Sequence, residues 1–129
     1  MPWVLLVEED SLKRDLLSRR LKARGFDVLA AVDGGHGIDV ARRERPDLVV
    51  IDTDLPDMDG WDAVRRLREG GATQGVPVIA VGGQHPTAGW PPAPGLRALC
   101  DDCETKPIDV PRLVGKIQAL LERQPARPV

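Results

Sequence analysis

The chain has 129 residues, which is the size of one domain and enough to bury roughly two-thirds of the surface that the unfolded chain exposes. Hydrophobic residues make up 42% and charged residues 29% of it, a composition typical of soluble globular proteins. Its 18 Lys and Arg against 20 Asp and Glu give a formal net charge of -2, which argues against nucleic acid and anionic membranes as partners.

The sequence also argues against export. No apolar run approaches the roughly 20 residues that span a bilayer, and Met1–Val7 lacks the basic leader and cleavage site of a signal peptide. We therefore expect a cytoplasmic protein. Cys100 and Cys103 form one C-x-x-C motif, which cannot supply a disulfide framework and has no second pair to complete a zinc site. We interpret them as small packed residues beside the last strand.

The first elements alternate short apolar runs with helical patterns, which is typical of βαβ units and a parallel sheet. Trp3–Val7 is a continuous apolar run, as expected for a parallel strand that is covered on both faces. Leucines at helical spacing over residues 12–21 then predict a helix, with Asp10 or Ser11 as its N-cap and Gly25 as its stop.

The next elements lead to an acidic residue at a strand end. Phe26–Ala31 is predicted to be a second strand. A short helix follows and ends at about Arg45, because the residue before Pro46 is biased away from helical conformation. Leu48–Ile51 predicts a buried third strand that delivers Asp52 at its C-terminal end.

The second half of the chain repeats the alternation. Trp61–Glu69 predicts a helix, Val76–Val81 a fourth buried strand and Cys103–Thr105 a short fifth strand. Asp109 caps the final helix and Pro111 lies in its first turn. The apolar stripe of that helix consists of Val110, Leu113, Val114, Ile117, Leu120 and Leu121.

One stretch, Gly82–Leu96, departs from the alternation. Its prolines and glycines are Pro86, Pro91, Pro92, Pro94, Gly82, Gly83, Gly89 and Gly95. Because proline inside a helix costs about 3 kcal/mol, we expect an irregular loop with at most a short helical turn at Leu96–Cys100. The tail Gln124–Val129 contains two prolines and is expected to be flexible, so the domain covers residues 1–123.

Polar residues gather at the predicted strand ends, namely Glu8, Glu9 and Asp10 after the first strand, Asp52 after the third and Lys106 after the fifth. Ligands of open α/β sheets bind at this edge. Clustered carboxylates repel one another unless a cation lies among them, and oxygen ligands suit Mg²⁺. A carboxylate can also attack a phosphoryl group, and a lysine can neutralise its charge.

Three segments carry a resemblance to a known family: V-L-L-V-E-E-D at Val4–Asp10, P-D-L-V-V-I-D-T-D-L-P-D-M-D-G-W at Pro46–Trp61, and D-D-C-E-T-K-P-I at Asp101–Ile108. In order and spacing they resemble the signature of response-regulator receiver domains (the CheY-like family), over roughly Val4 to Leu121. The resemblance implies a flavodoxin-like (βα)5 three-layer sandwich with a parallel sheet in the order 2-1-3-4-5. The proline-rich segment departs from the family here, since we expect it to shorten or replace the fourth helix.

The resemblance also implies a signalling function and no enzymatic one. Asp52 matches the aspartate that accepts a phosphoryl group from a sensor histidine kinase or phosphotransfer protein. Glu8 and Glu9 match the acidic pair that binds Mg²⁺ together with Asp52 and the backbone carbonyl of Asp54, and Lys106 matches the phosphate-binding lysine. Asp10 lies beyond this set and is interpreted as a helix cap. A downstream protein partner and a monomer or weak dimer are expected.

Two departures concern the switch that normally reports phosphorylation. The family has Ser or Thr where this chain has Gly82, and Tyr or Phe where it has Cys103. Backbone N–H groups of Gly82 and Gly83 are candidate phosphate ligands in place of the missing hydroxyl.

The alternative hypothesis is a pseudo-receiver, which binds a protein partner without being phosphorylated. Further alternatives are that Glu8 and Glu9 serve only the start of the first helix, and that Lys106 is an ordinary surface lysine. No output domain follows Leu121, so we expect either a stand-alone domain or a fragment of a longer regulator.

Overall fold

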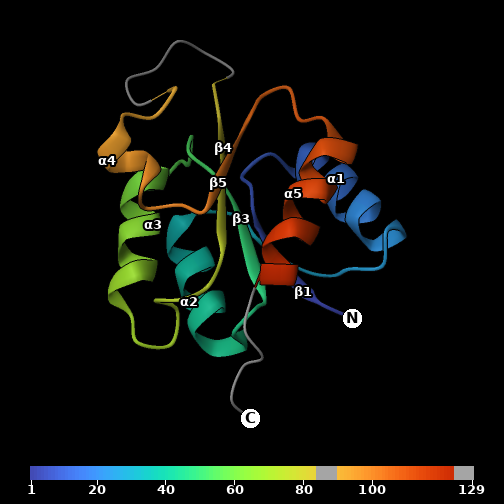
Figure 1. The fold of residues 1–129 in the computed structure, drawn as a ribbon, viewed down its shortest axis with the longest axis horizontal. Helices are drawn as coiled ribbons and strands as arrows, with labels where there is room; N and C mark the ends of the chain where they lie inside the picture. Colours follow the sequence, from blue (N-terminus) through green and yellow to red (C-terminus); the bar gives the residue numbers. More distant parts are fainter. Residues whose placement is uncertain (84–89, 124–129) are drawn as a thin grey trace.

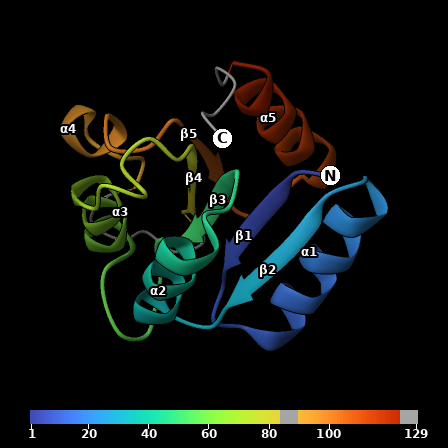
Figure 2. The ribbon, with the colours of Figure 1, turned by 90° about the horizontal axis from the view of Figure 1, so that it is seen from below.

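A computed structural model describes residues 1–83 and 90–123 of the chain. The strands are β1 (Trp3–Val7), β2 (Asp27–Ala31), β3 (Leu48–Asp52), β4 (Val78–Gly82) and β5 (Asp102–Thr105). The helices are α1 (Ser11–Ala23), α2 (Gly34–Glu44), α3 (Gly60–Glu69), α4 (Pro94–Arg97) and α5 (Val110–Arg123). The strands form one parallel sheet in the order β2-β1-β3-β4-β5, which lies between two groups of helices in Figure 1 and shows its strand order in Figure 2; this order confirms the flavodoxin-like fold. The predicted tail 124–129, and residues 84–89 of the predicted loop, lie outside the described residues.

Helices cover both faces of the sheet. Figure 2 shows α1 and α5 on one side and α2, α3 and α4 on the other. Successive residues of β1 point to opposite faces, so Leu5 and Val7 join one core while Val4 and Leu6 join the other. The two cores explain why the central strands are continuous apolar runs in the sequence. No helix within the described ranges is both long and apolar enough to cross a membrane.

Aspartate side chains begin the first and last helices, as predicted. Asp10 accepts hydrogen bonds from the backbone N–H groups of Leu12 and Lys13. Asp109 accepts one from the N–H of Arg112 at 3.0 Å. Both contacts satisfy donors that the first helical turn leaves without partners, so Asp109 caps its helix as predicted and Asp10 is the N-cap of the two candidates, Asp10 and Ser11.

The second helix begins earlier than its apolar residues indicate. Asp33 accepts a hydrogen bond from the His36 N–H at 2.8 Å. The two carboxylate oxygens of Asp57 accept hydrogen bonds from the N–H groups of Gly34 and Gly35, at 2.8 Å and 2.9 Å. Asp57 lies in the loop before α3, so this second cap is a tertiary contact that permits two glycines to start a helix.

The fourth helix is short, as expected, although its bounds differ from the prediction. It begins at Pro94, whereas the sequence placed a turn at Leu96–Cys100. Proline suits the first position of a helix, where its missing N–H would have no partner. Arg68 of α3 holds the segment after α4, because it donates to the carbonyl of Leu99 at 2.9 Å and pairs with Asp101 at 2.8 Å.

Both cysteines are free thiols, which agrees with their interpretation as packed residues. Cys100 is buried beneath α4 and Cys103 is partly buried within β5. Burial raises the pKa of the Cys100 thiol, so its reactive thiolate form is disfavoured.

Candidate functional site

The predicted acidic and basic residues meet at one edge of the sheet. Glu8 follows β1, Asp52 is the last residue of β3 and Lys106 follows β5. Parallel pairing of the strands keeps these three ends level, although β4 separates β3 from β5. The side chains converge on Asp52 from both sides.

Asp52 and Lys106 form a buried ion pair. The Lys106 Nζ lies 2.6 Å from Oδ2 of Asp52, and the two side chains are 8% and 7% exposed. The other oxygen of Asp52, Oδ1, accepts a hydrogen bond from the Asp54 N–H at 2.8 Å. Lys106 also lies 3.8 Å from Oδ2 of Asp54. Lys106 is therefore no ordinary surface lysine, and the Asp52 carboxylate is fixed in its orientation.

Glu8 brings a second carboxylate to Asp52. Its residue is 8% exposed, and burial is the main reason that the pKa of Glu8 rises to about 7; the charge of Asp52 and a hydrogen bond with it add to the rise. The N–H of Asp10 and the charge of Lys106 act in the opposite direction. Two acids thus compete for one lysine, so a further cation would relieve their repulsion.

Glu9 lies differently from Glu8. Its residue is exposed, while Glu8 is buried, because the chain bends at Glu9 after β1 has ended at Val7. No three His, Cys, Asp or Glu side chains within residues 1–83 and 90–123 form a ready metal-binding group. Mg²⁺ commonly takes only one or two carboxylates and fills its remaining positions with carbonyls and water. Asp52, one glutamate and the Asp54 carbonyl fit that requirement.

The loop after Asp52 is closed by contacts that the M-D-G motif provides. The N–H of Gly60 donates to the carbonyl of Thr53 at 3.1 Å, and the side chain of Asp59 accepts from the N–H of Trp61 at 2.8 Å. A Cβ at Gly60 would lie 2.4 Å from the Thr53 Cα and 2.7 Å from the Asp52 carbonyl oxygen. Only glycine permits this approach, and sequence reasoning identified the motif without its structural role.

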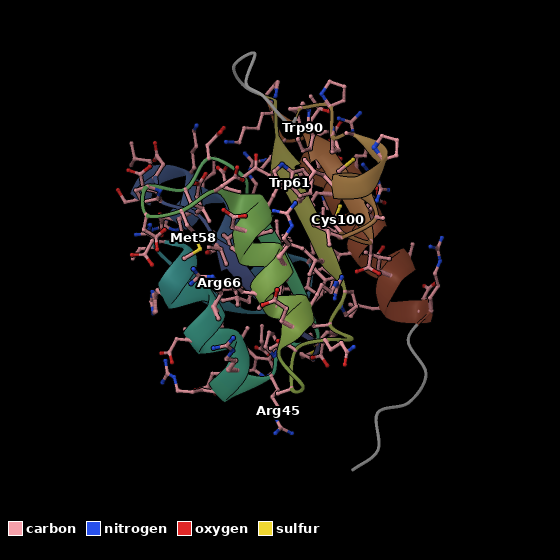
Figure 3. All side chains as sticks on the ribbon, turned by 90° about the vertical axis from the view of Figure 1, so that its left-hand side faces the viewer. Arg45, Met58, Trp61, Arg66, Trp90 and Cys100 are labelled. Atoms are coloured by element: carbon pink, nitrogen blue, oxygen red, sulfur yellow. The ribbon has the colours of Figure 1, made fainter. Side chains whose placement is uncertain are left out.

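The two positions of the expected switch lack its side chains, and an indole ring packs on one of them. Trp90 lies against Gly82 and Gly83, and it stacks on Trp61 of α3 with ring centroids 6.3 Å apart (Figure 3). Which surface Trp90 contacts could not be predicted from the sequence. Cys103 stands in β5, where its backbone carbonyl accepts a hydrogen bond from a lysine of α5.

A second buried acid lies in β5 and plays a structural part. Glu104 has a fully buried side chain, and its carboxylate lies 2.6 Å from Nη2 of Arg112 and 2.8 Å from Nζ of Lys116. Both cations come from α5, one helical turn apart, so this cluster fixes α5 on the sheet. Nothing in the sequence distinguished this glutamate from a surface residue.

An apolar groove of about 330 Å³ opens beside the acidic site. Its walls are Leu16 and Leu17 of α1, the segment Pro107, Ile108 and Val110, and the polar residues Glu8, Lys13, Arg20 and Lys106. Leu16 is 54% exposed, and its neighbour one turn earlier, Leu12, is 81% exposed. The groove joins two segments that lie far apart in the sequence, so sequence reasoning did not find it.

Comparison of the sequence with known proteins indicates the family of this chain. The sequence model described as the response regulator receiver domain matches residues 4–118. The DNA-binding dual master transcriptional regulator RpaA of Synechocystis is 36% identical over 125 residues, which cover 95% of this chain and 50% of RpaA. Protein PilH of Pseudomonas aeruginosa is 34% identical over 123 residues, which cover 94% of this chain and 98% of PilH. The chain thus spans about half the length of RpaA and nearly all of PilH.

A solved structure agrees with the sequence comparisons. The receiver domain of the sensor histidine kinase PA1611 from P. aeruginosa PAO1 has a TM-score of 0.84 and 26% identity, and the match covers 94% of this chain and 98% of that one. That structure has a magnesium ion coordinated in its active-site cleft. The fold, the match over residues 4–118 and the relatives together show that the chain belongs to the response regulator receiver domain family.

Proposed function

We propose that Asp52 accepts a phosphoryl group from a phosphohistidine of a sensor kinase or phosphotransfer protein, in the presence of Mg²⁺. The observation that carries this proposal is the buried Asp52–Lys106 pair with Glu8 beside it. A buried ion pair gives little net stability compared with apolar packing, and a third charged group makes the arrangement less favourable still. A functional role accounts for retaining three such groups at one strand end.

The residues divide the chemistry among them. One oxygen of the Asp52 carboxylate attacks phosphorus, and the phosphorus–nitrogen bond of the donor breaks. The imidazole takes the electron pair of that bond and leaves as a neutral group, because its other ring nitrogen is protonated. Lys106, which neutralises the free carboxylate, then neutralises the phosphoryl oxygens. The Asp54 N–H orients the carboxylate before attack. Mg²⁺, bound by Asp52, Glu8 or Glu9 and the Asp54 carbonyl, would offset the charge of the acids and of the phosphoryl group.

The groove beside this site suits the phosphodonor protein. A helix with apolar residues facing Leu12 and Leu16 would cover both side chains and bring its histidine to the edge near Lys106. We expect Leu16→Asp to slow transfer from a phosphohistidine protein roughly tenfold or more. The same variant should react normally with acetyl phosphate, which needs no docking surface. Equal loss with both donors would contradict this use of the groove.

A pseudo-receiver is the second candidate function, and Gly82 and Cys103 favour it because neither supplies the family's switch side chain. Acetyl phosphate and Mg²⁺ followed by intact-mass measurement separate the two functions, with Asp52→Asn as the control. The first function requires one added phosphoryl group in the wild type alone. Unchanged amide exchange after phosphorylation would show that the acid site works but is not coupled to an output.

A further inference from the structure

Trp90 covers the backbone at the C-terminal end of β4. Its six-membered ring lies over Gly82, where a Cβ would meet ring atoms at 2.8 Å and 3.1 Å. Its five-membered ring lies over Gly83, where a Cβ would meet Cδ1 and Nε1 at 2.4 Å. A side chain at either position therefore cannot coexist with the indole in this place.

The two glycines are required by Trp90 and by the backbone. Gly83 has a φ of +87°, a conformation that residues with a Cβ adopt rarely. A Cβ at Gly82 would also lie 2.5 Å from the Thr53 hydroxyl, the residue next to Asp52. The structure therefore explains why position 82 is a glycine: it makes room for the aromatic ring of Trp90.

Trp61 supports Trp90 from the side of α3. Trp61 is 4% exposed, and the two indoles stack with an angle of 24° between their planes (Figure 3). Trp61 follows Gly60, which contacts the backbone of Asp52 and Thr53 directly. The tryptophan pair is therefore linked to the residues beside Asp52 by two routes, through Gly60 to the backbone of Asp52 and Thr53 and through Gly82 to the Thr53 hydroxyl.

The N–H of Gly83 has no backbone hydrogen-bond partner among residues 1–83 and 90–123. Backbone N–H groups of glycines are common ligands of phosphate oxygens. Two adjacent glycines have much conformational freedom, however, and freezing it costs free energy unless a neighbour already restricts it. The indole packed over both residues supplies that restriction.

We propose that Trp90 is a positioning residue for the phosphoryl group: it takes the space of the missing hydroxyl side chain and holds the Gly82–Gly83 backbone so that the N–H of Gly83 meets a phosphoryl oxygen, while Gly82 stays paired with β5. This inference rests on the proposed function, since it concerns the phosphoryl group on Asp52. It also gives a different interpretation of Gly82: the glycine accommodates Trp90 and is not evidence that phosphorylation has been lost.

The test is the rate of Mg²⁺-dependent phosphorylation of the full chain by acetyl phosphate, in which Asp52 gains the phosphoryl group and acetate leaves. Trp90→Ala should slow the reaction roughly tenfold, less than the hundredfold or more that follows outright loss of a preorganised donor, and Trp90→Phe should keep most of the rate. Gly82→Ser should also slow it, because the new Cβ displaces the ring. In the Trp90→Ala background, Gly82→Ser should instead raise the rate, because the hydroxyl then has space once the remaining close atom, Oγ1 of Thr53, rotates away.

A purely structural role of Trp90 would not reverse the sign of the Gly82→Ser effect between the two backgrounds. Trp3→Phe leaves Trp61 and Trp90 as the only indoles, and their emission should change on phosphorylation but not in the Asp52→Asn variant. Trp3→Ala, at the opposite end of β1, is the control for loss of an indole. Gly82→Ser and Trp90→Phe keep the test independent of the folding of Trp90→Ala.

Two outcomes separate the proposals. Absence of any adduct on the wild type would overturn the proposed function and this inference together. Normal phosphorylation of the wild type with an unchanged rate in Trp90→Ala, or a Gly82→Ser effect of the same sign in both backgrounds, would overturn the role of Trp90 alone.

Discussion

Glu8→Gln should stabilise the metal-free protein while impairing its reaction. The pKa of Glu8 is raised from 4.5 to about 7, chiefly by burial. A folded-state pKa above the unfolded value means that the fold favours the protonated form. The stability that Glu8 contributes is therefore fully present below about pH 4.5 and is lost as pH rises through 7. The loss amounts to about 3 kcal/mol at pH 8.

Glutamine keeps the size of Glu8 and removes its charge. Without Mg²⁺, we expect Glu8→Gln to exceed the wild type in free energy of unfolding by up to about 3 kcal/mol at pH 8 and by little at pH 4.5. Urea unfolding followed by circular dichroism, with a chelator present, measures this difference. Glu9→Gln is the matched control, since that exposed side chain should change stability by less than about 0.5 kcal/mol.

Magnesium should offset part of this difference in stability. Mg²⁺ at about 100 times its Kd would stabilise the wild type by about 2.7 kcal/mol, and the variant by less. Below pH 7 a proton competes with the metal for Glu8, so the affinity of the wild type for Mg²⁺ should rise between pH 6 and pH 8. A variant no more stable than the wild type at pH 8, or a Mg²⁺ affinity that does not depend on pH, would refute this reasoning.

Three further substitutions test the surrounding structure. Lys106→Met should lower the free energy of unfolding by roughly 3 kcal/mol, and adding Asp52→Asn to the same chain should restore most of this loss. A double-mutant cycle in urea measures both changes. Gly60→Ala should cost about 2 kcal/mol or more because its Cβ meets backbone, whereas Gly71→Ala, with nothing within 4 Å, should be nearly neutral in thermal unfolding. Asp57→Ala should cost about 1 kcal/mol and speed amide exchange at the start of α2; unchanged exchange there would contradict its capping role.

The sequence predicted the sheet well because each central strand is buried on both faces. Leu48–Ile51 has no polar residue, so its burial and its delivery of Asp52 followed from local composition alone. The caps Asp10 and Asp109 were equally local. These features depend on neighbours within a few residues, which is the range that a sequence pattern describes.

Features that depend on distant segments were not predicted. The start of α2 depends on Asp57, which lies in the loop between β3 and α3. The groove depends on the contact between α1 and the segment after β5. Trp90 appeared in the sequence as an aromatic residue in a proline-rich loop, and only the fold shows that Gly82 accommodates it. Likewise the sequence did not distinguish Glu8 from Glu9, whereas the bend after β1 leaves the first buried and the second exposed.

The most direct test of the account is to locate the phosphoryl group. The full chain is incubated with acetyl phosphate and Mg²⁺, and the product is digested and sequenced by mass spectrometry beside Asp52→Asn and a sample with a chelator. We expect one added phosphoryl group per chain, on Asp52, formed only with Mg²⁺ and absent from the variant. An adduct at another residue, or none on a folded protein that binds Mg²⁺, would contradict Asp52 as the phosphoacceptor.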